Sequence, residues 1–367
     1  MPKTKSRLKK SGCFLTGFFL IIIAGLVLFI KFDTPVAAQF TDNYLRPLLG
    51  NTIVGFLEKT YFNASDKFQQ LTDKTGLNNI PQFVDQGIAT DATPIPLTNG
   101  LPKVSGEGVW RDRPLSLFTG EKVMAYTFVR PDPTRPFSYV TLAEMDMGKM
   151  QLGVVAGTKQ PGGVIGNPGP GVIPQEILNS GNLIAAFDGG FQYRDGGYGM
   201  IVGEKIYVPL RDNVGTLVGY KNGTLKIINY QGQDLGQDVA FIRQNCPILV
   251  ENGEVFALNE INKKLWGRTF NADIYTWRSG IGLTKGGNLI YAVGNNLSPE
   301  TLATALKMAG AENAIQLDIN PFWVRFNIFE PDGKGGYKTS TLTKDLKNGS
   351  NGYLNGYTKD FFYLYAK

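Results

Sequence analysis

Residues 183–191 read Leu-Ile-Ala-Ala-Phe-Asp-Gly-Gly-Phe, an apolar run that ends in an acid and two glycines. Such a run predicts a buried β-strand that places the carboxylate of Asp188 at the edge of a sheet. Gly189 and Gly190 lack a Cβ atom, so a ligand could approach their backbone closely. The alternative interpretation is structural, with Asp188 and Gly189 forming only a hairpin turn.

Strand patterns dominate the chain on both sides of this run. Residues 122–130 and 137–145 flank the turn Pro131-Asp132-Pro133, which predicts two paired strands. Residues 314–317 and 323–329 predict two further short strands.

Helical patterns are few. Residues 173–178 predict one short helix, and a longer one begins with Ser298 as N-cap and Pro299 at the first helical position, ending at Gly310. Together these patterns predict an α+β fold of mixed, mostly antiparallel β-sheets with a few flanking helices.

The N-terminus has the pattern of a membrane anchor. Residues 1–11 are a basic tail, and residues 12–31 are almost entirely apolar. At about 1.5 Å per residue, this segment is long enough for a transmembrane signal-anchor helix. Because the basic residues precede it, we expect the remaining chain to lie outside the cytoplasm. The alternative is secretion after cleavage near Ala38.

Three regions are expected after the anchor. Apolar residues recur at helical spacing in residues 32–75, which predicts a helical stalk. Residues 76–104 are rich in proline and glycine and are typical of a linker or a strap across a domain surface. Residues 105–367 form the predicted main domain.

Composition excludes several chemistries. The 367 residues contain no histidine, which excludes Ser-His-Asp catalysis and every His-ligated metal site. The net charge of +6 comes from six cations before residue 32, so the rest of the chain is neutral and nucleic-acid binding is not expected. Only Cys13 and Cys246 are present, so we expect no disulfide and interpret Cys246 as a small buried residue.

Two further segments carry polar residues between apolar stretches. The first is Arg243-Gln244-Asn245. The second is a pair of apolar stretches that could lie side by side, with Arg278 and Asp318 at their ends. The structural interpretation of each is an ordinary turn or salt bridge.

Taken in order, these motifs resemble the phosphodiester glycosidase family over residues 120–330. The resemblance rests on Ala-Phe-Asp-Gly-Gly-Phe, Arg-Gln-Asn, Trp-Arg-Ser-Gly-Ile-Gly and Leu-Asp-Ile-Asn. It implies a hydrolase that cleaves a sugar-1-phosphodiester, in envelope or exopolysaccharide glycans. For this reaction we expect Asp318 as base or nucleophile, with Asp188 as second choice or as its partner. Arg278 is the expected phosphate clamp, with Arg243 and Arg194 as alternates. The implied substrate-binding residues are Gly189, Gly190, Arg194, Tyr198, Arg243, Asn245, Ser279, Asn320 and Trp323.

The chain departs from the family pattern at two places. Asp188 stands where the family usually has asparagine. The family continues Leu-Asp with Gly-Gly-Gly-Ser, whereas this chain has Ile319-Asn320-Pro321 after Leu317-Asp318. The sequence resembles a bacterial branch that carries the Leu-Asp-Ile-Asn form.

Two alternatives stay open at this point. A protein of the same fold could bind glycans or act as an envelope scaffold without catalysis. A structural calcium ion could be held by Asp188, Asp195 and Asp318. We otherwise expect no cofactor and no metal.

Overall fold

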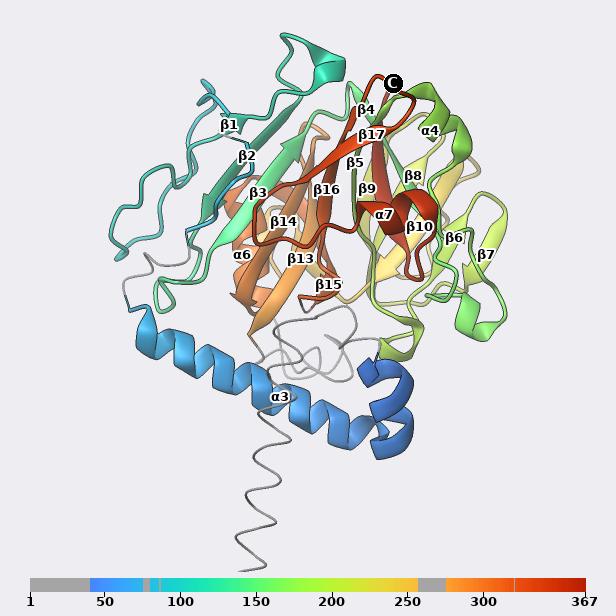
Figure 1. The fold of residues 1–367 in the computed structure, drawn as a ribbon, viewed down its shortest axis with the longest axis horizontal. Helices are drawn as coiled ribbons and strands as arrows, with labels where there is room; N and C mark the ends of the chain where they lie inside the picture. Colours follow the sequence, from blue (N-terminus) through green and yellow to red (C-terminus); the bar gives the residue numbers. More distant parts are fainter. Residues whose placement is uncertain (1–39, 75–79, 86, 257–274, 320) are drawn as a thin grey trace, which may run out of the picture. The chain divides into compact units, whose positions relative to one another are not determined.

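The computed structural model (Figure 1) describes most of the chain beyond the N-terminus. The described residues are 40–74, 80–85, 87–256, 275–319 and 321–367. The predicted basic tail and transmembrane segment lie outside them, as does Asn320. Within the described residues, no helix is long and apolar enough to cross a membrane. The chain divides into two compact units, Met1–Tyr61 and Phe62–Lys367.

The helix predicted in residues 32–75 is present. A π-helical turn at Thr41–Leu45 leads into α3, Arg46–Thr72, which has one non-helical residue at Gly50, with φ of 79°. A positive φ is accessible to glycine because it has no Cβ atom. The structure thus confirms a helix here, and its role as a stalk stays a prediction.

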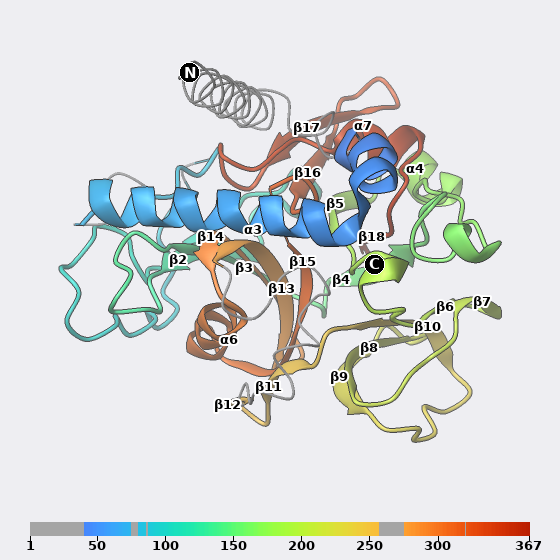
Figure 2. The same cartoon turned by 90° about the horizontal axis from the view of Figure 1, so that it is seen from below.

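The unit from Phe62 to Lys367 is built on three sheets whose strand pairs are antiparallel (Figures 1 and 2). The eight-stranded sheet has the order β1 Arg111–Asp112, β2 Met124–Val129, β3 Val140–Met145, β14 Leu289–Leu297, β13 Thr276–Thr284, β15 Ala311–Ile319, β11 Ile248–Glu251 and β12 Glu254–Val255. One five-stranded sheet has the order β7 Lys205–Val208, β6 Met200–Val202, β10 Val239–Asn245, β8 Val214–Tyr220 and β9 Leu225–Tyr230. The other has the order β17 Tyr337–Thr341, β16 Phe326–Pro331, β5 Leu183–Asp188, β18 Phe361–Ala366 and β4 Met150–Val155.

The remaining elements are short. They are the helices α4 Gln175–Ser180, α6 Pro299–Met308 and α7 Ser350–Asn355, and the 3-10 turns Ser116–Phe118, Gly163–Ile165 and Tyr193–Asp195. Helix α6 begins as predicted, because the Ser298 side chain accepts a hydrogen bond from the Thr301 amide, and Pro299 occupies the first turn. It packs against β13, β14 and β15 (Figure 2). The α+β prediction is confirmed for the described residues.

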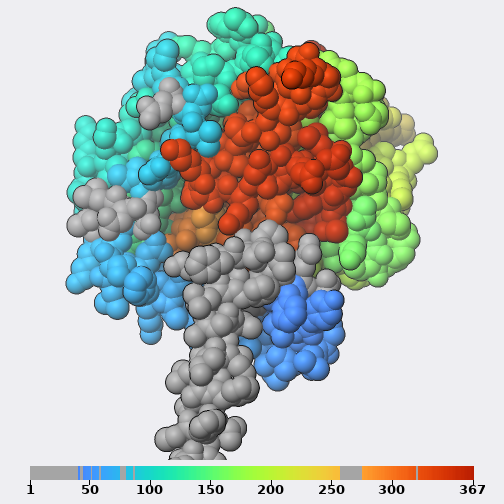
Figure 3. Space-filling model, in the orientation of Figure 1, coloured from blue at the N-terminus to red at the C-terminus, as the bar shows by residue number. Residues whose placement is uncertain are grey.

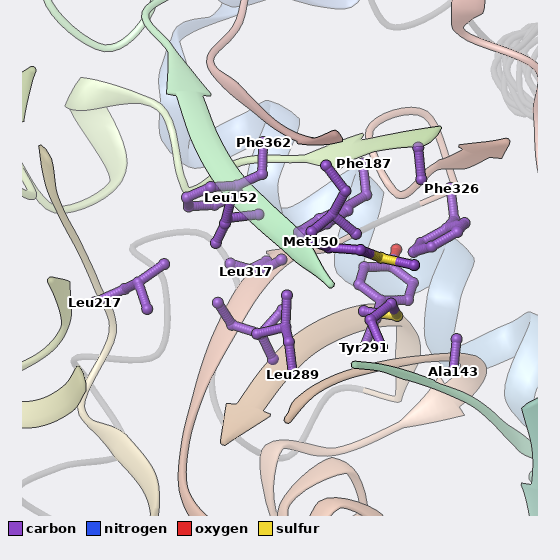
Figure 4. Close-up of a cluster of buried hydrophobic side chains, with 14 of the residues drawn as sticks. Ala143, Met150, Leu152, Phe187, Leu217, Leu289, Tyr291, Leu317, Phe326 and Phe362 are labelled. Carbon is purple, nitrogen blue, oxygen red and sulfur yellow. The ribbon is translucent and has the colours of Figure 1, made fainter. Parts of the chain in front are cut away.

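The core lies between the three sheets. One cluster of buried side chains joins Leu317 of the eight-stranded sheet, Leu217 of the β8 sheet, and Leu152 and Phe187 of the β5 sheet (Figure 4). Every residue of β5 is buried, and its neighbours are β16 and β18. The hairpin interpretation of Asp188-Gly189 is therefore wrong, since β5 pairs with strands far along the chain.

The described residues among 80–104 pack against the sheets of this unit and are called the strap here. Phe83 forms a β-bridge with Thr343, and Ala89 forms one with Arg111. The amide of Gly87 donates to the Tyr126 hydroxyl at 2.6 Å. In Figure 3 the strap, in light blue, lies beside the red C-terminal segments on the face shown. The described residues of this segment thus contact the sheets, and its assignment as a linker or a strap stays a prediction.

Candidate functional site

Asp188 ends β5 inside a shell of three hydrogen-bond donors. Its Oδ2 accepts from the Ser279 hydroxyl at 2.5 Å. Its Oδ1 accepts from the Tyr291 hydroxyl at 2.7 Å and from the Arg325 amide at 3.0 Å. Strand β5 is held beside β16, which follows Arg325 directly, and this pairing places the carboxylate there. Both carboxylate oxygens are therefore held by the protein.

Asp318 lies next to Asp188 near the end of β15. The Ser279 hydroxyl, which donates to Asp188, also accepts from the Asp318 amide at 3.1 Å. Asp318 Oδ1 accepts from the Ile319 amide at 2.9 Å, and its Oδ2 forms an ion pair with Lys359. Ser279 thus links the two acids, because β13 pairs with β15 as the sequence led us to expect.

Burial raises the pKa of both acids. Loss of hydration raises the pKa of Asp188 to about 6, although its hydrogen bonds with Arg325, Ser279 and Tyr291 act in the opposite direction. The pKa of Asp318 rises to about 7, again mainly through burial; the Lys359 charge lowers it and the Asp188 charge raises it further. Two interacting carboxyls with pKa values near neutrality are typical of acid–base or nucleophilic sites.

The glycines after Asp188 allow two buried charged side chains to approach the backbone. The Gly190 amide donates to Asp360 Oδ2 at 2.9 Å, and the same oxygen accepts from Arg243 Nε at 2.8 Å. A Cβ atom on Gly189 would lie 2.2 Å from Asp360, and one on Gly190 would lie 2.4 Å from Arg243. The glycines here admit protein groups, whereas the sequence suggested an approaching ligand.

Asn245 joins the glycine turn to the end of β15. Its Oδ1 accepts from the Phe191 amide at 3.3 Å. Its Nδ2 donates to the Gln316 carbonyl at 2.6 Å and also to the Leu317 carbonyl. Asn245 therefore fixes the segment that leads into Asp318.

Arg278 lies on β13 beside Ser279 and is fully buried. Its Nε donates to the Leu297 carbonyl at 2.7 Å, and its Nη1 donates to Gln316 Oε1 at 3.0 Å. Burial lowers the pKa of Arg278 to about 10. The guanidinium thus connects β13, β14 and β15, one residue along β13 from Ser279.

The other predicted residues lie at varied distances from this centre. Trp323 is half-buried, with its ring centroid 4.7 Å from Lys359 Nζ. Tyr198 is buried and hydrogen-bonded to Cys246, and burial raises the pKa of both side chains. Arg194 is the most exposed, at 36%, and lies 3.8 Å from Asp195. Cys246 is a buried free cysteine, as predicted.

Lys359, Asp360 and Tyr291 were not predicted from the sequence. Lys359 and Asp360 immediately precede β18, and Tyr291 lies inside the apolar strand β14. The sequence carries one available signal, two adjacent opposite charges immediately before the apolar run 361–366, but such a pair is also common on surfaces.

The two acids are buried and line neither of two cavities in the described part of the chain. Asp188 and Asp318 are each 3% exposed. The cavities, of about 490 and 470 Å³, are lined by other residues. Within the described part of the chain, no group of three or more acidic or sulfur ligands could hold a metal ion, so the calcium alternative gains no support there.

Comparison with known proteins identifies a family for the central part of the chain. Residues 181–318 match the phosphodiester glycosidase family. No curated protein in the comparison matches the chain.

Two solved structures are distantly similar. The catalytic domain of zebrafish N-acetylglucosamine-1-phosphodiester alpha-N-acetylglucosaminidase, auto-inhibited by its pro-peptide, is 15% identical with a TM-score of 0.45, covering 70% of this chain and 88% of that one. A hypothetical protein from Synechocystis is 13% identical with a TM-score of 0.36, covering 67% and 62%.

The raised pKa of Asp188 predicts a pH-dependent stability. Between its unfolded pKa of 3.8 and its folded pKa of about 6, the folded protein binds more protons, so this stabilising contribution is lost as pH rises. Relative to Asp188→Asn, the wild type should lose on the order of 3 kcal/mol of unfolding free energy between pH 4 and 7. Urea unfolding at several pH values measures this. Exposed Asp212→Asn is the control, and parallel curves for wild type and Asp188→Asn would contradict the assignment.

Substitution of Gly190 should destabilise the fold. In Gly190→Ala the new methyl group meets Arg243, which is held by its ion pair with Asp360, so we expect a loss of about 1–3 kcal/mol. Gly286→Ala is the matched control, since its Cβ atom would meet nothing closer than 3.8 Å. Equal midpoints of urea unfolding for the two variants would show that Arg243 can move aside.

Proposed function

We propose that this chain is a hydrolase that cleaves a sugar-1-phosphodiester, because residues 181–318 match the phosphodiester glycosidase family. The observation that carries this proposal is that the matched segment contains both buried acids and ends at Asp318. The bond to be broken joins the anomeric carbon to a phosphate oxygen. Water supplies a hydroxyl group to that carbon and a proton to the medium, and the phosphomonoester departs with the bonding electrons.

We assign the role of base or nucleophile to Asp318. Asp188 already accepts hydrogen bonds from three donors, which leaves it less able to take up a proton or attack carbon. Asp318 accepts one amide hydrogen bond and the Lys359 ammonium, whose charge favours its ionised form. Asp188 acts as a positioning residue, because its bond to Ser279 orients the hydroxyl that also binds the Asp318 amide.

We assign the phosphate contact to Lys359 in the first place. Its ammonium group lies between the Asp318 carboxylate and the Trp323 ring, so a phosphate could exchange with the carboxylate as its partner. Arg278 is held by Leu297 and Gln316 and supports the site from behind. The leaving phosphomonoester is stable as an anion, so the reaction needs little general-acid assistance.

The burial of both acids favours a second candidate function. A glycan-binding protein of the same fold, without catalysis, fits carboxyl groups that are each 3% exposed and line neither the 490 nor the 470 Å³ cavity. In such a protein, the ion pair of Lys359 and Asp318 would be purely structural.

We also propose that the protein is exported and anchored in the membrane by residues 12–31, with an envelope or exopolysaccharide glycan as substrate. The basic residues before that segment support this orientation. Secretion after cleavage near Ala38 is the alternative, and the N-terminal sequence of the mature protein distinguishes them.

The first test is sugar release from a panel of sugar-1-phosphodiesters, including a nucleotide sugar. We expect Asp318→Asn to lower kcat/KM about 10²–10⁴-fold, because asparagine can neither take a proton nor attack carbon. Asp212→Asn serves as the control. Release unaffected by Asp318→Asn would refute its role, and release from no substrate would favour the binding protein.

Removal of the Lys359 charge should move the pH profile. In the wild type, kcat/KM should rise with pH around the Asp318 pKa of about 7. In Lys359→Met the midpoint should move to higher pH, because the cation that lowers this pKa is gone. Exposed Lys122→Met should leave the midpoint in place. A lower rate with an unchanged midpoint would mean that Lys359 does not set the ionisation of Asp318.

A further inference from the structure

A cavity of about 470 Å³ lies one strand away from Ser279. Val293 on its wall pairs directly with Ser279 across β13 and β14, and Thr141 on the same wall pairs with Val293. Trp277 also lines it, two residues before Ser279 and therefore on the same face of β13. The cavity thus lies on the face of the eight-stranded sheet from which Ser279 reaches Asp188.

The chemistry of the cavity suits a neutral, hydroxyl-rich ligand. Its side-chain amides are Gln69, Gln82, Asn295 and Asn296, and Trp277 adds a half-exposed aromatic ring. Among the described residues that line it, Lys344 and Asp345 alone are charged, and they are exposed and opposite in sign. The other cavity, of about 490 Å³, has a far more charged lining, which includes Asp85, Asp112, Arg113, Glu121, Lys122 and Glu330. Pockets that combine one aromatic surface with a few fixed polar groups are typical of small-molecule sites.

The amides on this wall are held in a defined arrangement. Asn296 has a φ of 58°, a left-handed conformation that a non-glycine residue adopts rarely. Its carbonyl accepts from the Ser138 hydroxyl at 2.9 Å, and its Nδ2 donates to Gln69 at 2.7 Å. Asn295 Oδ1 accepts from the Asn296 amide at 2.8 Å. Backbone strain held in place by several contacts is concentrated at functional sites.

We propose that this cavity binds a neutral saccharide, on the side of the scissile bond that carries the released sugar. This inference rests on the proposed function, since it divides the substrate between a phosphate at Lys359 and a sugar chain beside Trp277. The cavity has near-zero net charge and several amide groups, which match uncharged hydroxyl groups better than a phosphate. Trp277 offers the sugar ring an apolar face, and Asn295 and Gln82 offer hydrogen bonds.

The test titrates the full-length chain with neutral trisaccharides, namely maltotriose, cellotriose and triacetylchitotriose, and records tryptophan fluorescence and heat. We expect at least one to bind, with a fluorescence change that is lost in Trp277→Phe and kept in Trp110→Phe. Asn295→Asp retains the oxygen that accepts from Asn296 but loses the amide donor, so it should fold and bind about tenfold more weakly. Lys122→Ala, in the other cavity, should bind like the wild type.

The hydrolysis assay separates failure of this inference from failure of the proposed function. Sugar release without trisaccharide binding, or binding unaffected by Trp277→Phe and Asn295→Asp, overturns the saccharide site and leaves the hydrolase standing. Binding that these two variants weaken, without release from any phosphodiester, supports the site and overturns the hydrolase. If the protein both binds a trisaccharide and releases sugar from a phosphodiester, KM for substrates with a longer sugar chain should rise in Asn295→Asp while kcat stays unchanged.

Discussion

Two adjacent residues, Lys359 and Asp360, hold the three sheets together at the candidate site. Lys359 pairs with Asp318 of the eight-stranded sheet, and Asp360 pairs with Arg243 of β10, while both directly precede β18 of the third sheet. All four side chains are almost fully buried. An unpaired buried charge costs several kcal/mol of stability. Each sheet must therefore place its charged side chain within reach of the oppositely charged partner.

This constraint also accounts for the pKa values of the acids. Asp188 and Asp318 lie where water is excluded, which favours their neutral forms, while Lys359 favours their ionised forms. As a result, the two carboxyl groups have pKa values of about 6 and about 7, in a chain that contains no histidine. The Ser279 hydroxyl is hydrogen-bonded to both residues. The ionisation of one carboxyl group therefore changes the pKa of the other.

Local sequence patterns predicted the individual strands and helices. They could not predict which side chains from distant strands meet at the candidate site. The strands at 122–130 and 137–145 and the helix begun by Ser298 follow from short-range signals, whereas the pairing of β13 with β15 joins residues about 40 positions apart. The role of Lys359 could not be predicted, because its partner Asp318 lies 41 residues earlier and Lys359 belongs to no recognisable motif. Likewise, the glycines after Asp188 indicated a close approach but not that Arg243 and Asp360 make it.

The strap has a consequence for how this protein can be shortened. Ile80, Pro81 and Gln82 form part of the wall of the 470 Å³ cavity, and Gly87 binds the Tyr126 hydroxyl. A truncated protein beginning at residue 105, where the strand-rich sequence starts, would retain each of the strands β1 to β18 described above. It would nevertheless lose one side of the cavity and expose Phe128 and Tyr139, which pack against Ile80 and Phe83. Fragment boundaries chosen from strand patterns alone would thus remove part of the cavity wall and part of the core.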